Sequence, residues 1–190
     1  MVEYLYGYVC HQLVNRSPQM DGHVFPLCYR CAGIHLGVFV STGYFVISGG
    51  WRRDFPPLRA SLLLTLLLFP VWIDGWANGL GFWHTPGPLR YLTGLAMGFG
   101  LPLLLLPLCR FGAGPASISK ESSLRVVLDL VGLFAMGLLF LLLLTQPYGV
   151  VVWPGMEYLA LLGTVSLAAI TGLTFRSVFQ SWKTVPVESN

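Results

Sequence analysis

Charged residues are scarce in this sequence. Lys, Arg, Asp and Glu supply 10% of its 190 residues, whereas hydrophobic residues supply 55% and the mean hydropathy is +0.69. This balance excludes an ordinary soluble domain, in which about a quarter of the residues are charged. A nucleic-acid partner is also excluded, because the net charge of +3 is not gathered into a basic patch on a soluble face. The composition therefore predicts an integral membrane protein.

The chain also lacks the features of a cleaved leader. Its opening, MVEYLYGYV, has neither a basic n-region nor a small-residue cleavage site before Cys10. We therefore expect the amino terminus to stay on the protein. No internal repeat is visible, and residues 1–190 are predicted to form a single integral membrane domain.

Long apolar runs are abundant. Five of them approach the roughly 20 residues needed to cross about 30 Å of hydrocarbon. A helix satisfies its own backbone polar groups in lipid, so the runs predict an all-α polytopic bundle of about five transmembrane helices. Residues 1–31 then form a Cys/His-rich segment outside the membrane, and residues 175–190 form a tail. The predicted spans are residues 32–50, 60–80, 88–108, 126–145 and 151–174.

Two small-residue patterns lie in these spans. Gly33-x-x-x-Gly37 and Gly94-x-x-x-Gly98 each place two glycines on one helix face. Such faces let transmembrane helices approach closely, so we expect both patterns to serve packing.

The basic residues predict an orientation, because Lys and Arg concentrate on the cytoplasmic side of a membrane. With five spans, one side receives eight of them and the other receives three, which places the N-terminus outside and the C-terminus inside. The same topology brings the N-terminal cysteines, Asp74, Asn78 and the FWHTPGPLR link to the outer face. The eight are Arg52, Arg53, Arg59, Arg110, Lys120, Arg125, Arg176 and Lys183, and the three are Arg16, Arg30 and Arg90.

Three of the four cysteines lie ahead of or at the start of the first span. Cys28-x-x-Cys31 is the most specific local motif, because two thiols at this spacing can coordinate one metal ion or form a small disulfide. With Cys10 and a histidine from His11, His23 or His35, the pair would suit zinc. A purely structural disulfide or zinc clip remains the alternative. Cys109, by contrast, is expected to be a packing residue.

Asp74 is the second conspicuous residue, because a carboxylate at membrane depth costs roughly 2.5–3.5 kcal/mol on insertion scales. We expect it to face the bundle, with Arg90 at the start of the third span as its ion-pair partner. The pair either joins two helices or takes part in acid–base work and the recognition of an anionic headgroup.

The motifs "CHQ", "RS" and "CYRCAGIHLG", followed by "IDGWANGLG" and "LRYLTGLAMGFG", resemble a family of small prokaryotic membrane proteins known as domain of unknown function 2085. The resemblance covers about the first 100 residues. It implies a location in the prokaryotic cell (inner) membrane and supplies no activity. It implies importance for Cys10, His11, Gln12, Arg16, Ser17, Cys28, Arg30, Cys31, Gly33, Asp74, Gly75, Arg90, Thr93 and Gly94.

The leading functional hypothesis is a zinc-binding membrane protein whose outward site acts on a lipid or lipid-linked substrate, as a metal-dependent hydrolase or transferase would. One alternative is a thiol–disulfide oxidoreductase that uses Cys28 and Cys31, and another is a metal carrier or an accessory subunit of a larger membrane complex. Under the leading hypothesis, the metal ligands are Cys10, His11, Cys28 and Cys31, the catalytic residues are His11, Asp74 and Arg90, and the substrate-binding residues are Gln12, Arg16 and Arg30.

Overall fold

The computed structural model describes residues 6–20, 22–47, 57–109, 123–145 and 149–183. The described residues form one short 3₁₀ helix, two short strands and six α-helices. These elements are η1 (Val14–Arg16), β1 (Gln19–Met20), β2 (His23–Val24), α2 (Tyr29–Ile47), α3 (Leu58–Leu66), α4 (Phe69–Gly79), α5 (Gly87–Leu108), α6 (Ser123–Thr145) and α7 (Gly149–Lys183).

Within this part of the chain, five helical segments are long and apolar enough to cross a membrane, which confirms the predicted five-span all-α bundle. The last helix continues to Lys183, beyond the expected end of its span at residue 174. The five segments are Tyr29–Ile47, Leu58–Gly79, Gly87–Leu108, Val127–Thr145 and Val152–Gln180.

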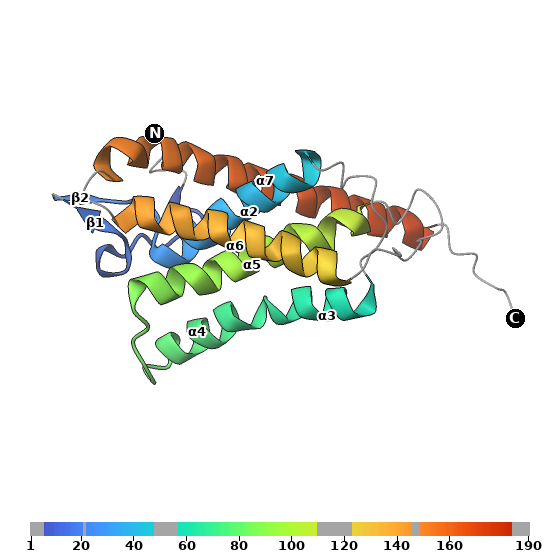
Figure 1. The fold of residues 1–190 in the computed structure, drawn as a ribbon, viewed down its shortest axis with the longest axis horizontal. Helices are drawn as coiled ribbons and strands as arrows, with labels where there is room; N and C mark the ends of the chain where they lie inside the picture. The colour runs from blue at the N-terminus through green and yellow to red at the C-terminus, as the bar shows by residue number, and fades with distance from the viewer. Residues whose placement is uncertain (1–5, 21, 48–56, 110–122, 146–148, 184–190) are drawn as a thin grey trace, which may run out of the picture.

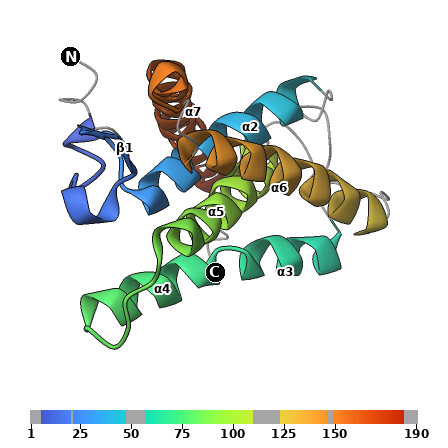
Figure 2. The ribbon, with the colours of Figure 1, turned by 60° about the vertical axis from the view of Figure 1, so that its left-hand side comes forward.

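The helices lie side by side along the long axis of the molecule, with α2 and α5 at the centre (Figures 1 and 2). Helix α7 lies on one side of this pair, and α3 and α4 lie on the other. Successive spans run in opposite directions. One end of the bundle, at the left of Figure 1, therefore gathers the N-terminal segment, the end of α4 and the starts of α5 and α7.

The direction in which this end faces across the membrane stays a prediction. It rests on the distribution of basic residues, and Arg52, Arg53, Arg110 and Lys120 of that count lie outside the described residues.

Helices α2 and α5 meet through their glycines, as the two small-residue patterns predict. A Cβ added to Gly33 would lie 2.3 Å from the carbonyl oxygen of Tyr91, and one added to Gly94 would lie 2.2 Å from the carbonyl oxygen of Arg30. Only a residue without a side chain allows backbones this close. The contact fixes the start of α2, with its cysteines, against the start of α5.

The second span is broken in two. Helix α3 ends at Leu66, and α4 begins at Phe69 with Pro70 in its first turn. Proline has no N–H to donate to the preceding turn, so it fits best in the first turn of a helix. The break therefore lets α4, which holds Asp74, adopt its own direction.

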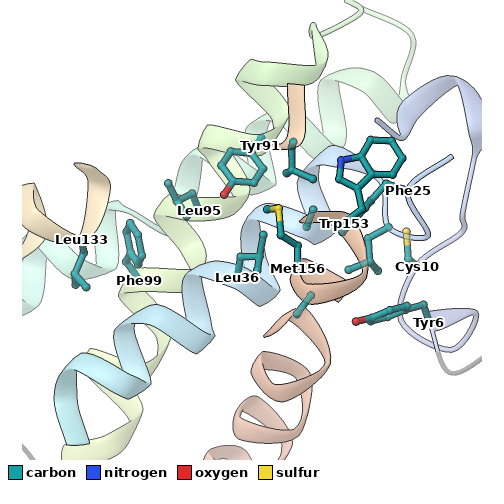
Figure 3. Close-up of a cluster of buried hydrophobic side chains, with 14 of the residues drawn as sticks. Tyr6, Cys10, Phe25, Leu36, Tyr91, Leu95, Phe99, Leu133, Trp153 and Met156 are labelled. Carbon is teal, nitrogen blue, oxygen red and sulfur yellow. The ribbon is translucent and has the colours of Figure 1, made fainter. Parts of the chain in front are cut away.

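The N-terminal segment packs onto the bundle through buried side chains (Figure 3). Phe25 and Leu27 are fully buried, and the Phe25 ring lies edge-on to Trp153 of α7 with ring centroids 5.6 Å apart. The Tyr6 hydroxyl donates to the carbonyl oxygen of Glu157 in the same helix. The segment is therefore anchored to α7 as well as to α2.

A small antiparallel hairpin in this segment was not predicted from the sequence. Strands β1 and β2 pair Gln19 with Val24 and Met20 with His23. Two residues per strand are too few to leave an alternating pattern in the sequence. Its neighbour Gly22 has a φ of 79°, the left-handed conformation that glycine adopts without strain.

Candidate metal centre and adjoining polar network

Cys10, Cys28 and Cys31 meet at the end of the bundle that holds the N-terminal segment. Their sulfur atoms all lie within 4.8 Å of one another, and all three thiols are free. Cys10 is contributed by the N-terminal segment and is buried beside Tyr6 and Phe25 (Figure 3). Cys28 directly precedes α2, and Cys31 lies in its first turn. The cluster thus joins two parts of the sequence that are 18 positions apart.

Backbone donors surround the Cys10 sulfur. The N–H of Cys28 donates to Cys10 Sγ at 3.3 Å, and the N–H of Gln12 donates to it at 3.5 Å. Gln12 has a φ of 47°, a left-handed conformation that is uncommon outside glycine, in the turn that brings its N–H to the sulfur. Backbone donors and the N-terminal end of a helix both favour a negatively charged sulfur.

The protons of the cluster are shared unequally. Hydrogen bonds from the Cys28 thiol, and then from the Cys31 thiol, hold the pKa of Cys10 well below its ordinary value. The pKa of Cys28 is raised, chiefly because its thiol donates to Cys10. The Cys10 sulfur, which also accepts two backbone N–H groups, is therefore the sulfur in the cluster that most favours a negative charge, and a cation would displace protons from the other two thiols.

The donor set fits zinc. Thiolates are preferred zinc ligands at about 2.3 Å, and tetrahedral ligation at that length places sulfurs about 3.8 Å apart. The observed sulfurs, which are at most 4.8 Å apart, would have to move together by about 1 Å or less. Three cysteines supply three of the four positions of a tetrahedral site.

A polar network lies beside the first turn of α2, the turn that also holds Cys31. Arg30, between Cys28 and Cys31 in the sequence, forms an ion pair with Asp74 of α4. The Asp74 side chain is 5% exposed and that of Arg30 is 24% exposed. The pair satisfies a carboxylate that would be costly if it faced lipid, as the sequence predicts.

The partner of Asp74 differs from the predicted one, because the expected pair with Arg90 is not formed. Arg90 of α5 instead donates to the side-chain oxygen of Asn78, one turn further along α4. The Asn78 amide donates to Asp74 Oδ1 at 2.8 Å, which links the two arginines through one network. Arg30 reaches Asp74 because the backbone contact between α2 and α5 brings the start of α2 close to α4.

Thr85 completes this network, and the sequence did not single it out. Its hydroxyl donates to Asp74 Oδ1, and its backbone N–H donates to Asn78 Oδ1 at 3.3 Å. The only available sign was its place before Pro86, at the start of the third span. A polar residue just ahead of a helix is common there whatever its function.

The other predicted site residues lie around these two clusters. His11 is exposed and falls outside the three-cysteine group, and the side chain of Gln12 is half-buried. Arg16 is exposed and lines a cavity together with Arg90. The buried His35 has a different contact, since its Nδ1 lies 3.1 Å from the Thr164 hydroxyl of α7. The structure thus brings Cys10, Cys28 and Cys31 together, and separately Arg30, Asp74 and Arg90.

Comparison with known proteins covers the half of the chain that carries these clusters. The model of the family described as predicted membrane protein (DUF2085) matches residues 10–104, which include all three cysteines, Asp74 and Arg90. An uncharacterised protein of Methanothermobacter thermautotrophicus is 39% identical over 105 residues, which are 55% of this chain and 90% of that protein. An uncharacterised protein of Methanocaldococcus jannaschii is 31% identical over 104 residues, which are 55% of this chain and 65% of that protein. No solved structure matches the chain.

Proposed function

This chain belongs to the DUF2085 family of predicted membrane proteins, and we propose that it binds one zinc ion through Cys10, Cys28 and Cys31. In this proposal the multi-pass membrane protein acts on a lipid or lipid-linked substrate. The observation that best supports this proposal is that three free thiols from two separate segments lie within 4.8 Å of one another. Hydrophobic packing alone does not require sulfurs to converge.

Three protein ligands leave one position of a tetrahedral zinc ion for water or substrate. A zinc ion bound there would polarise a carbonyl or phosphoryl oxygen or make a bound water more acidic. This chemistry suits a metal-dependent hydrolase or transferase, which is the reaction class we propose.

The remaining residues have roles in this proposal that follow from their contacts. His11, which is exposed beside Cys10, moves protons and is not needed as a ligand. Asp74, predicted as an acid or base, has its carboxylate engaged by Arg30, Asn78 and Thr85, so we assign it to positioning Arg30. Arg90, held by Asn78, is assigned to the substrate.

The test is elemental analysis of the full chain purified in a neutral detergent, together with a count of free thiols. We expect one zinc per chain in the wild type and its loss in Cys28→Ser and Cys31→Ser. Cys109→Ser is the matched control, because the Cys109 sulfur lies 3.1 Å from Thr174 Oγ1 and is outside the three-cysteine group. His11→Ala should keep its zinc. Equal metal content in all variants, or none in the wild type, would refute the metal site.

A membrane thiol–disulfide oxidoreductase is the second candidate. It is favoured by the lowered pKa of the hydrogen-bonded Cys10 beside the Cys28-x-x-Cys31 pair, since a thiolate is the attacking species in disulfide exchange. This function predicts a wild-type protein without zinc in which two thiols appear only after reduction. The same thiol count therefore separates the two candidates.

A further inference from the structure

A cavity of about 370 Å³ opens beside the polar network, between the N-terminal segment, the end of α4 and the start of α5. From its lining we infer that it binds a phosphate group, as the mono- or diester of a lipid headgroup or as free phosphate. The inference deepens the proposed function by naming the substrate class. Binding of phosphate in the cavity does not depend on that function, whereas the statement that the phosphate belongs to a substrate rests on it. The side chains that carry it are Asn15, Arg16, Asn78, His84, Thr85 and Arg90.

The lining holds two cations, Arg16 and Arg90, that form no ion pair with another described residue. The nearby carboxylate of Asp74 is paired with Arg30, and neither residue is among those that line the cavity. Arg16 and Arg90 both line it, and the hydrogen bond that Arg90 donates goes to the neutral amide of Asn78. The cavity therefore has an excess of positive charge, which favours an anion.

Arg90 is the residue most in need of such a partner. It is 8% exposed, and its buried Nε has no hydrogen-bond partner. A buried guanidinium is costly unless an anion or a set of acceptors satisfies its N–H groups. Phosphate oxygens fit arginine well, because they can accept two parallel hydrogen bonds from one guanidinium.

The structure also holds this arginine in place before any anion arrives. Asn78 accepts from Arg90 while its own amide donates to Asp74, and Thr85 joins the same network. A side chain that is already fixed loses less conformational entropy when it binds. The positive end of α5 adds to the site, since Gly87 in the lining is the first residue of that 22-residue helix.

The position of the cavity favours a lipid as the source of the phosphate. Asn78 and Arg90 lie close to the ends of their spans, Leu58–Gly79 and Gly87–Leu108, where headgroups begin. The neighbouring aromatic residues are exposed: 68% for Trp76, 79% for Phe82 and 55% for Trp83. Tryptophan prefers the headgroup level of a membrane. A phospholipid at that level presents its phosphate at the height of the cavity.

The experiment titrates the purified full chain in a neutral maltoside detergent with three probes by calorimetry. The probes are inorganic phosphate, short-chain dihexanoyl phosphatidic acid, and dihexanoyl glycerol, which has the same chains without the phosphate. We expect the phosphatidic acid to bind and the glycerol not to bind. Arg90→Gln should weaken binding about tenfold or more, as loss of a charged hydrogen bond does.

Arg16→Gln tests the same cavity from an exposed position, so it keeps the inference testable if Arg90→Gln does not fold. We expect it to weaken binding several-fold, whereas Arg59→Gln on α3, which is also exposed and is absent from the lining, should leave binding unchanged. Binding of phosphatidic acid but not of inorganic phosphate identifies a lipid source, and equal binding of both identifies free phosphate. Binding that is the same in Arg16→Gln, Arg90→Gln and wild type would overturn the inference, as would no binding of either phosphate probe.

The zinc content of each sample separates this result from the proposed function. Phosphate binding that persists in the zinc-free Cys28→Ser variant supports the cavity independently of the metal. A wild-type protein that contains zinc yet binds neither phosphate probe overturns the cavity alone. A wild-type protein without zinc that still binds phosphatidic acid overturns the metal site alone.

Discussion

Arg30 and Asp74 form an ion pair that joins the first turn of α2 to α4. The pair connects the start of α2, where Cys28 and Cys31 lie, to α4, whose Asp74 and Asn78 belong to the polar network that holds Arg90.

Removing the carboxylate should destabilise the bundle. In Asp74→Asn the charge of Arg30 is left without its partner, and breaking a buried pair costs 3–5 kcal/mol in general. Because the Arg30 side chain keeps 24% exposure, we expect a smaller loss, about 2 kcal/mol in the free energy of unfolding. Denaturant unfolding in mixed micelles measures it, with Arg59→Gln as the control for loss of a surface charge. An unchanged midpoint in Asp74→Asn would show that the pair contributes nothing to stability.

Gly94→Ala should be among the most damaging small substitutions. Its new Cβ would lie 2.2 Å from the carbonyl oxygen of Arg30, and backbone on both sides leaves no flexible group to yield. We expect a loss of about 3 kcal/mol, at the upper end for overpacking. Gly172→Ala is the matched control, because nothing lies within 4 Å of a Cβ there and alanine favours the helix. The two melting temperatures should therefore move in opposite directions, and a similar shift in both would contradict the close contact of α2 and α5.

Phe25→Ala should loosen the N-terminal segment and weaken the metal centre with it. The fully buried ring packs edge-on against Trp153, and its removal should cost about 3 kcal/mol. Since this segment carries Cys10, limited proteolysis ahead of α2 should become faster and the zinc content should fall. Phe82→Ala is the control, because Phe82 is 79% exposed. Faster cleavage with full zinc content would show that Cys10 is placed independently of the aromatic anchor.

The metal-free protein should keep one thiolate in mildly acidic solution. Hydrogen bonds from Cys28 and Cys31 lower the pKa of Cys10, so at about pH 6 it should remain ionised although an ordinary cysteine, with a pKa of about 8.5, would not. Ultraviolet thiolate absorbance after chelation measures this, and Cys10→Ser should abolish it whereas Cys109→Ser should not.

The lowered pKa of Cys10 also has a defined effect on stability. The stabilising contribution of this thiolate is complete above the ordinary cysteine pKa and is lost as the pH falls through the lowered folded-state pKa. The metal-free wild type should therefore lose stability on acidification relative to Cys10→Ser. A parallel pH profile of the two proteins would contradict the shared-proton arrangement.

The sequence predicted the bundle well because the relevant signal is local. Twenty apolar residues mark a span wherever they occur, and alternation of five spans is enough to bring the N-terminal cysteines and Asp74 to one end. The sequence predicted side-chain pairs between helices less well, because those pairs depend on how each helix is rotated about its axis. Whether Asp74 meets Arg30 or Arg90 is decided by the glycine contact between α2 and α5 and by the break before Pro70. These two features set how α2 and α4 are oriented relative to α5, and no pattern in a single sequence predicts those orientations.

Arg30 stands between Cys28 and Cys31, so a single helical turn serves both the thiol cluster and the network that holds Arg90. If the three sulfurs moved together around an ion, that turn would shift, and with it the hydrogen-bond network that holds Arg90 in the wall of the cavity. Thermodynamic reciprocity then fixes the result in both directions: the factor by which the ion changes the affinity for phosphate equals the factor by which phosphate changes the affinity for the ion.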